Sequence, residues 1–130
     1  MLVADLMTLI ELEPDNAHAL NALGYHLTDN NIELERAENL LDQAIALLPN
    51  DPAIMDSLGW LYYRQGKLAA SIELLTDAYK LLPDSEIAAH LGEALWLSGR
   101  EDEATQLIEK ALISDPEDDK LLHVQKKYSE

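Results

Sequence analysis

The chain has 130 residues, 48% of them hydrophobic, which is enough apolar surface for one compact domain. It carries 25 acidic residues against 9 Lys and Arg, so its formal net charge is −16. A surface this negative repels phosphate backbones and anionic lipid headgroups, so we predict no nucleic-acid partner. Cysteine is absent, which excludes disulfides, thiolate metal sites and cysteine nucleophiles.

Leucine and alanine dominate the apolar residues with 26 and 16 copies, whereas Val and Ile together number 10. Unbranched residues favour helices and β-branched residues favour strands, so the composition predicts an all-α fold. The longest apolar runs, such as residues 44–48, are too short to span a bilayer. A secretory signal begins with a positively charged region, but no Lys or Arg precedes Arg36. We expect no direct membrane insertion.

The first predicted element is a helix within residues 1–14, where Leu2, Leu6 and Leu9 recur at helical spacing before Pro14. The end of a stack of helices needs a polar cap, and this stretch shows none. We therefore expect it to be the second helix of a preceding pair, in a chain that is a fragment of a longer protein. The alternative is a self-contained protein whose open end pairs with a second copy.

Three helix pairs follow, at residues 17–51, 52–84 and 85–118. In the first pair a turn at residues 29–31 separates the helices, because Asp and Asn tolerate the left-handed conformation. In the second pair, Asp51 caps a helix over residues 52–64, and Gly66 precedes a helix over residues 68–82. In the third pair, the sequence predicts helices over residues 85–97 and 101–114, with Gly99 in the turn between them. A last helix within residues 119–130 is expected to cap the carboxyl-terminal end.

A repeat of 33 to 35 residues underlies this organisation, since Gly24, Gly59 and Gly92 each follow a leucine. A tiny side chain allows two helices to approach closely, so we interpret these glycines as packing points. Other small residues and the terminal prolines keep the same interval, namely Ala37, Ser71 and Ala104, then Ala44, Ala78 and Ala111, then Pro49, Pro83 and Pro116.

This pattern resembles the tetratricopeptide repeat, a helix-turn-helix unit of about 34 residues. The resemblance covers residues 17–116 as three full repeats, with a further helix on each side. It implies a right-handed superhelical solenoid in which the first helix of each pair lines a concave groove. The repeats also look like the carboxyl-terminal part of large lipoproteins and adaptors of Gram-negative bacteria. That likeness implies a periplasmic or outer-membrane parent protein, although the sequence itself does not fix the compartment.

The groove positions implied by this resemblance hold both tryptophans and two tyrosines of the chain. Such side chains offer a large contact area at a low entropic cost, as interface hot spots do. We predict a protein-interaction module, without enzymatic activity or a cofactor, that binds a protein or peptide segment. The segment is expected to be apolar or weakly basic, because the groove positions include two carboxylates and one cation. The predicted groove residues are Asn21, Tyr25, Asp56, Trp60, Tyr63, Arg64, Glu93 and Trp96.

Three alternatives stay open. Trp60 and Trp96 could belong partly to the core. The apolar face of residues 1–12 could pair two copies into a homodimer. Glu86, His90 and Glu93 lie at i, i+4 and i+7, so they could bind a metal ion in a metal-dependent enzyme, although an acidic helical chain produces such neighbours by chance.

Overall fold

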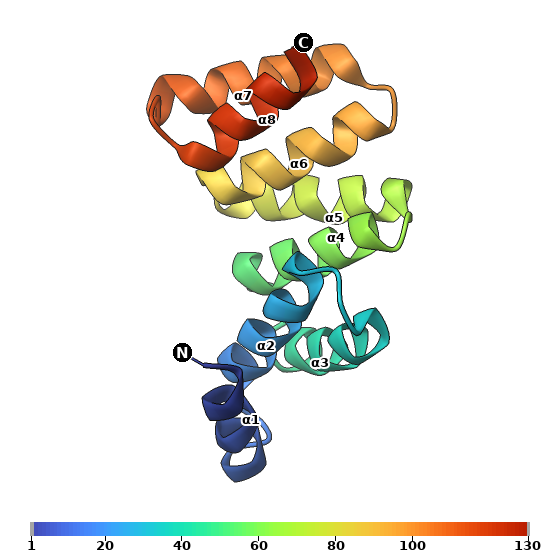
Figure 1. Cartoon of the computed structure of the whole chain (residues 1–130), viewed down its shortest axis with the longest axis vertical. Coiled ribbons are helices and arrows are strands. Elements are labelled where there is room, and N and C mark those ends of the chain that lie inside the picture. Colours follow the sequence, from blue (N-terminus) through green and yellow to red (C-terminus); the bar gives the residue numbers. More distant parts are fainter. Residues whose placement is uncertain (1, 130) are drawn as a thin grey trace.

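The computed structural model describes residues 2–129, which form eight α-helices and no β-strand. The helices stack along the long axis of the molecule, with α1 at one end and α7 and α8 at the other (Figure 1). The predicted all-α solenoid of helix pairs is confirmed. The helices are α1 Val3–Leu12, α2 Ala17–Asp29, α3 Leu34–Leu47, α4 Pro52–Arg64, α5 Leu68–Leu81, α6 Ser85–Leu97, α7 Glu101–Ser114 and α8 Asp119–Ser129.

Helices pack within pairs and between successive pairs. The pairs are α2 with α3, α4 with α5, and α6 with α7, and the second helix of a pair contacts the first helix of the next. The last helix, α8, packs on both α6 and α7, so it takes the place of the first helix of another pair. The helices lie within the predicted units, but the boundaries 17–51, 52–84 and 85–118 stay predictions.

A capping side chain precedes each helix that opens a pair, and α8 as well. Asn16, Asp51 and Asp84 accept a hydrogen bond from the backbone N–H three residues later, at 3.0, 3.2 and 2.9 Å. Asp118 does the same for α8 at 2.9 Å. Such caps satisfy N–H groups that the helix itself leaves without a partner. The sequence next to each of these four helices therefore determines where the helix begins.

The turns within the pairs use left-handed backbone conformations. Gly66 and Gly99 have φ of 78° and 91°, as the glycine pattern predicts. In the first pair, Asn31 and Glu33 have φ of 55° and 46°. Asparagine tolerates this region, whereas Glu33 adopts it without the side chain that usually favours it.

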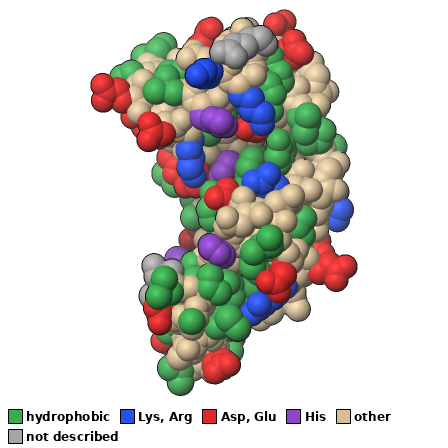
Figure 2. All heavy atoms as spheres, in the orientation of Figure 1, with side chains coloured by type: hydrophobic (Ala, Val, Ile, Leu, Met, Phe, Trp, Pro, Cys, Tyr) green, Lys and Arg blue, Asp and Glu red, His purple; other side chains and the backbone are tan. Residues whose placement is uncertain are grey.

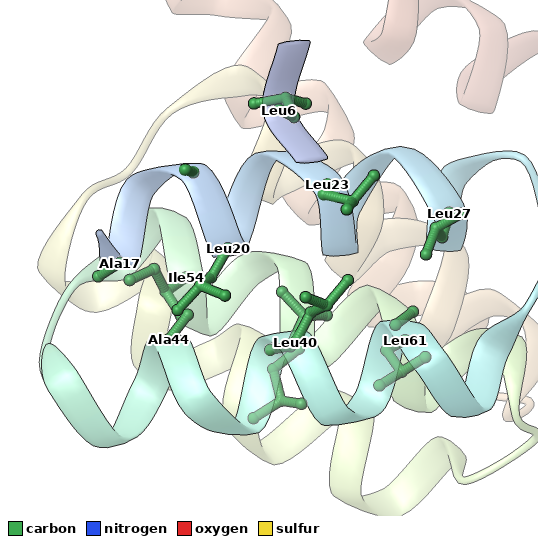
Figure 3. Close-up of a cluster of buried hydrophobic side chains, with 13 residues drawn as sticks. Leu6, Ala17, Leu20, Leu23, Leu27, Leu40, Ala44, Ile54 and Leu61 are labelled. Atoms are coloured by element: carbon green, nitrogen blue, oxygen red, sulfur yellow. The ribbon is translucent and has the colours of Figure 1, made fainter. Parts of the chain in front are cut away.

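The repeated glycines are explained by close helix packing. A Cβ atom added to Gly59 would lie 2.6 Å from Cγ of Leu75 on α5. Equivalent atoms on Gly24 and Gly92 would lie 2.7 and 2.6 Å from the side chains of Leu41 and Ile108. Figure 3 shows the core of the first pair, in which Leu6 of α1 joins side chains of α2, α3 and α4.

Candidate functional site

The first helices of successive pairs share one face of the solenoid, because α2 contacts α4, α4 contacts α6, and α6 contacts α8. We call this surface the inner face. Two cavities open on it. The mixed-charge cavity, of about 420 Å³, is lined by Asp29, Trp60, Tyr63, Arg64, Ala89, His90, Glu93, Asp119, Lys120, His123, Val124 and Lys127. The acidic cavity, of about 200 Å³, is lined by Asn21, Ala22, Tyr25, Ala53, Asp56, Ser57, Asp84, Glu86 and Ile87.

Seven of the eight predicted groove residues line these two cavities. Trp96 does not; it lines a third cavity, of about 660 Å³, between α7 and α8. There its ring stacks on Tyr128 with the centroids 4.9 Å apart. The acidic cavity holds Asn21, Tyr25 and Asp56, and the mixed-charge cavity holds Trp60, Tyr63, Arg64 and Glu93.

Trp60 is packed among other side chains of the inner face. Its ring stacks on Tyr63 and on His90, with centroids 4.4 and 4.2 Å apart, and the residue is only 6% exposed. Its Nε1 donates to Asp29 at 3.3 Å, and the guanidinium of Arg64 lies 4.9 Å from the ring. Trp60 therefore belongs largely to the core, as the first alternative expected, and only a small part of its side chain faces the cavity.

A buried polar pair lies beneath Trp60. Nδ1 of His90 lies 2.8 Å from Oδ1 of Asp56, and both residues are 5% exposed. Burial raises the pKa of the Asp56 carboxyl, and the hydrogen bond with His90 offsets this only in part. The pair ties α6 to α4 and holds the His90 ring against Trp60.

A second polar network crosses the inner face from the first pair to α8. The Tyr25 hydroxyl donates to Glu86 at 2.7 Å, and Lys120 forms an ion pair with the same carboxylate. Burial would raise the pKa of Glu86, but the hydrogen bonds from Lys120 and Tyr25 outweigh it, so this pKa is lowered. Burial and the bond to Glu86 raise the pKa of Tyr25. Tyr25 and Glu86 line the acidic cavity and Lys120 lines the mixed-charge cavity, so the network lies where the two cavities adjoin.

One wall of the mixed-charge cavity was not predicted from the sequence, because the helix within residues 119–130 was expected only to cap the solenoid. Lys120, His123 and Lys127 recur at i, i+3 and i+7, so they share one side of α8 and face the cavity. That spacing was readable in the sequence. Its meaning was not, because nothing local showed that α8 packs beside α6. Figure 2 shows Lys, Arg and His side chains gathered on the upper half of one face of this acidic molecule.

The metal-site alternative finds no geometric support among residues 2–129, where no group of three His, Asp or Glu side chains is placed to hold an ion. Glu86 and Glu93 instead accept from Lys120 and Lys127 of α8, respectively. Over the same described range, no helix has both the length and the apolar character needed to cross a membrane.

Comparison with known proteins identifies the repeat. The tetratricopeptide repeat family model matches residues 31–86 and 57–119. TPR repeat-containing protein PA4667 of Pseudomonas aeruginosa is 54% identical over 89 residues, which are 68% of this chain and 15% of that protein. Bacteriophage adsorption protein A of Escherichia coli is 35% identical over 69 residues, or 53% of this chain and 7% of that protein. The chain thus spans a small part of the length of these relatives.

Solved structures show the same architecture. TTC0263 of Thermus thermophilus, described as a thermophilic TPR protein, matches with a TM-score of 0.80 at 25% identity, covering 97% of this chain and 69% of that one. MamA of Desulfovibrio magneticus RS-1 has a similar fold, with a TM-score of 0.69 at 19% identity, covering 96% of this chain and 65% of that one. The family match, the helix pairs and the glycine packing agree: the chain belongs to the tetratricopeptide repeat family, whose fold serves in general as a scaffold for protein–protein interaction.

Proposed function

We propose that this chain binds an extended segment of a partner protein in a groove formed by the acidic and mixed-charge cavities. The observation that carries this proposal is the mixed-charge cavity, because four helices converge on it and supply aromatic, cationic and anionic side chains. Concave sites with a few converging polar groups are typical of binding sites. No reaction is part of the proposal, in keeping with the scaffold role of the fold.

The charges of the groove support a weakly basic or apolar segment. Six carboxylates and three Lys or Arg side chains line the two cavities together. The excess of negative charge adds to the net charge of −16, and both favour a positively charged partner over an acidic one.

A display library of random twelve-residue peptides, selected on the immobilised chain, tests this function. The best peptide is labelled, and its affinity is measured by fluorescence anisotropy. Ala53→Lys places a cation at an exposed residue of the acidic cavity, and Ala69→Lys makes the same change on an exposed residue of α5 that lines neither cavity. We expect the groove variant to weaken binding about tenfold and the α5 variant to leave it within about twofold. Equal effects of the two variants contradict the proposal.

A second candidate function, self-association through α1, is favoured by exposed apolar side chains. Leu2 and Leu12 are 74% and 75% exposed, and Met7 is 41% exposed. Exposed apolar patches commonly mark contact surfaces. Light scattering over a range of concentrations should then show a dimer that Leu12→Asp converts to a monomer. A monomer at every concentration rules this function out.

We also propose that the parent protein acts in the envelope of a Gram-negative bacterium. The Escherichia coli relative is named for bacteriophage adsorption, and phages adsorb at the cell surface. Fractionation of cells that express the full-length gene product tests this location, and recovery in the cytoplasm alone contradicts it.

A further inference from the structure

The two cavities of the groove differ in charge. Three carboxylates, Asp56, Asp84 and Glu86, line the acidic cavity, and none of the described residues lining it is Lys, Arg or His. All three cations of the groove line the mixed-charge cavity, together with two histidines. Apart from Lys120, whose ammonium pairs with Glu86, positive charge is therefore confined to the mixed-charge end of the groove.

The acidic cavity also contains an acceptor without a donor. The side-chain oxygen Oδ1 of Asn21 is buried and has no hydrogen-bond partner within residues 2–129. Such unsatisfied buried groups are uncommon in folded proteins, and each calls for an explanation. An ammonium or guanidinium group that reached this oxygen from the cavity would supply the donor. This observation concerns an amide and is independent of the carboxylates around it.

The mixed-charge cavity holds a cation that is fixed in place without a carboxylate partner. Arg64 donates from Nε to the carbonyl oxygen of Thr28 at 3.1 Å and from Nη2 to that of Asp29 at 2.8 Å. These acceptors are uncharged, and Nη1 makes no bond within the described residues. His123 is exposed and likewise makes no hydrogen bond there, while Lys127 keeps 46% of its side chain exposed. Arg64, His123 and Lys127 line the same cavity, so an anionic group that enters it finds these donors on its walls.

The distance between the two ends sets the spacing that a ligand must have. On α4, Ala53, Asp56 and Ser57 line the acidic cavity, and Trp60, Tyr63 and Arg64 line the mixed-charge cavity. Their centres lie seven residues apart, which is about 10 Å at the helical rise per residue. An extended chain in the polyproline II conformation advances about 3.1 Å per residue and has three residues per turn, so residues three apart span this distance and point to the same side.

We propose, on the basis of the proposed function, that the bound segment carries one basic and one acidic side chain about three residues apart. The basic side chain enters the acidic cavity, near Asn21 and Glu86, and the acidic side chain lies against Arg64, His123 and Lys127. The groove therefore fixes the register of the segment.

The ion pair between Glu86 and Lys120 stands where the two cavities meet. Its side chains are 42% and 50% exposed, and exposed pairs contribute little to stability. A basic side chain of the ligand can therefore replace Lys120 on Glu86. The released ammonium then adds to the positive charge that faces the ligand's carboxylate.

Four synthetic nine-residue peptides, blocked at both ends and of alanine, leucine and threonine background, test this inference. The first carries arginine and glutamate three residues apart, and the second carries them side by side. The third and fourth replace glutamate or arginine by glutamine. By fluorescence anisotropy we expect the first peptide to bind about tenfold more tightly than each of the others. Blocking the ends removes terminal charges, so the side-chain carboxylate alone is tested.

A charge reversal on the protein gives a second readout. His123→Glu places a carboxylate at the mixed-charge end, and His18→Glu makes the same change on an exposed residue of α2 that lines neither cavity. His123→Glu should abolish the preference for the glutamate peptide over its glutamine form, whereas His18→Glu should preserve it. Similar affinities of the four peptides, or a preference that survives His123→Glu, overturn the inference. If the selected library peptide still responds to Ala53→Lys in that case, the proposed function stands; if it does not, that function fails as well.

Discussion

The hydroxyl of Tyr128 on α8 donates a hydrogen bond of 2.9 Å to the carboxylate of Glu93 on α6. Tyr63 of α4 donates to the same oxygen at 3.0 Å, and Nζ of Lys127 lies 3.3 Å from it. Glu93 is 7% exposed, so a nearly buried carboxylate joins three helices of the inner face. Its burial is compensated because three donors surround it.

Glu93→Ala should detach α8 from this network. Three donors lose their acceptor, so we expect the free energy of unfolding to fall by about 2–4 kcal/mol. Because Tyr128 and Lys127 both lie on α8, its amide hydrogens should exchange faster, while those of α2 change less. Hydrogen exchange with mass spectrometry measures both helices. Glu73→Ala, on an exposed position of α5, is the control. Unchanged exchange in α8 would show that Leu121 and Val124 hold this helix without Glu93.

Gly59→Ala tests the close packing of α4 on α5. The added Cβ would lie 2.6 Å from Cγ of Leu75, so we expect a loss of about 1–3 kcal/mol despite the better helix propensity of alanine. Leu75→Ala removes the obstacle at its own cost of about 2–5 kcal/mol. In the double variant, Gly59→Ala should be neutral or stabilising. Urea denaturation of the unchanged chain, the two single variants and the double variant gives a double-mutant cycle. Strict additivity of the two changes in unfolding free energy would contradict the steric explanation.

The fold was predictable because its determinants are local and repeat. The caps Asp51 and Asp84, the turn glycines Gly66 and Gly99, and the packing position of Gly59 each act through neighbours in the same helix pair. The helix over residues 52–64 was predicted with its observed bounds, and the one that follows ends at Leu81, one residue earlier than predicted.

The candidate site was less predictable, because its contacts join distant parts of the chain. The groove positions placed Tyr63 and Arg64 on the inner face, but they gave no sign that Trp60 stacks on His90 of the next pair. They also missed the cationic side of α8, since Lys120 meets Tyr25 across 95 residues of sequence. The net charge of −16 gives no sign of these local cations.

Asp56→Ala should destabilise the chain, because it leaves the buried imidazole of His90 without its partner at 2.8 Å. We expect a loss of about 2–3 kcal/mol in the free energy of unfolding, and a smaller loss for Asp56→Asn, which keeps an oxygen acceptor. Since the His90 ring stacks on Trp60, tryptophan fluorescence should shift in the alanine variant even before unfolding. Asp42→Ala, at an exposed position of α3, is the control. A loss no larger than that of the control would mean that the pair contributes nothing.

Alkaline pH should destabilise the chain through the tyrosines of the inner face. Burial raises the pKa of Tyr25 and of Tyr63, and burial together with the hydrogen bond to Glu93 raises the pKa of Tyr128 to about 12. A tyrosine whose pKa is higher in the folded state contributes stability that is fully present below its unfolded pKa of about 10. That contribution is lost as the pH rises through the folded pKa. The melting temperature should therefore fall above about pH 10.

Removing one of these hydroxyl groups should flatten this alkaline decline. Tyr63→Phe eliminates one group with a raised pKa, so its melting temperature should fall less steeply above about pH 10, from a lower starting value because the bond to Glu93 is lost. Tyr79→Phe, on α5 outside the groove, is the matched control. Absorbance of tyrosinate, recorded during the titration, shows whether ionisation coincides with unfolding. Complete ionisation near pH 10 in the folded protein would contradict the raised pKa values.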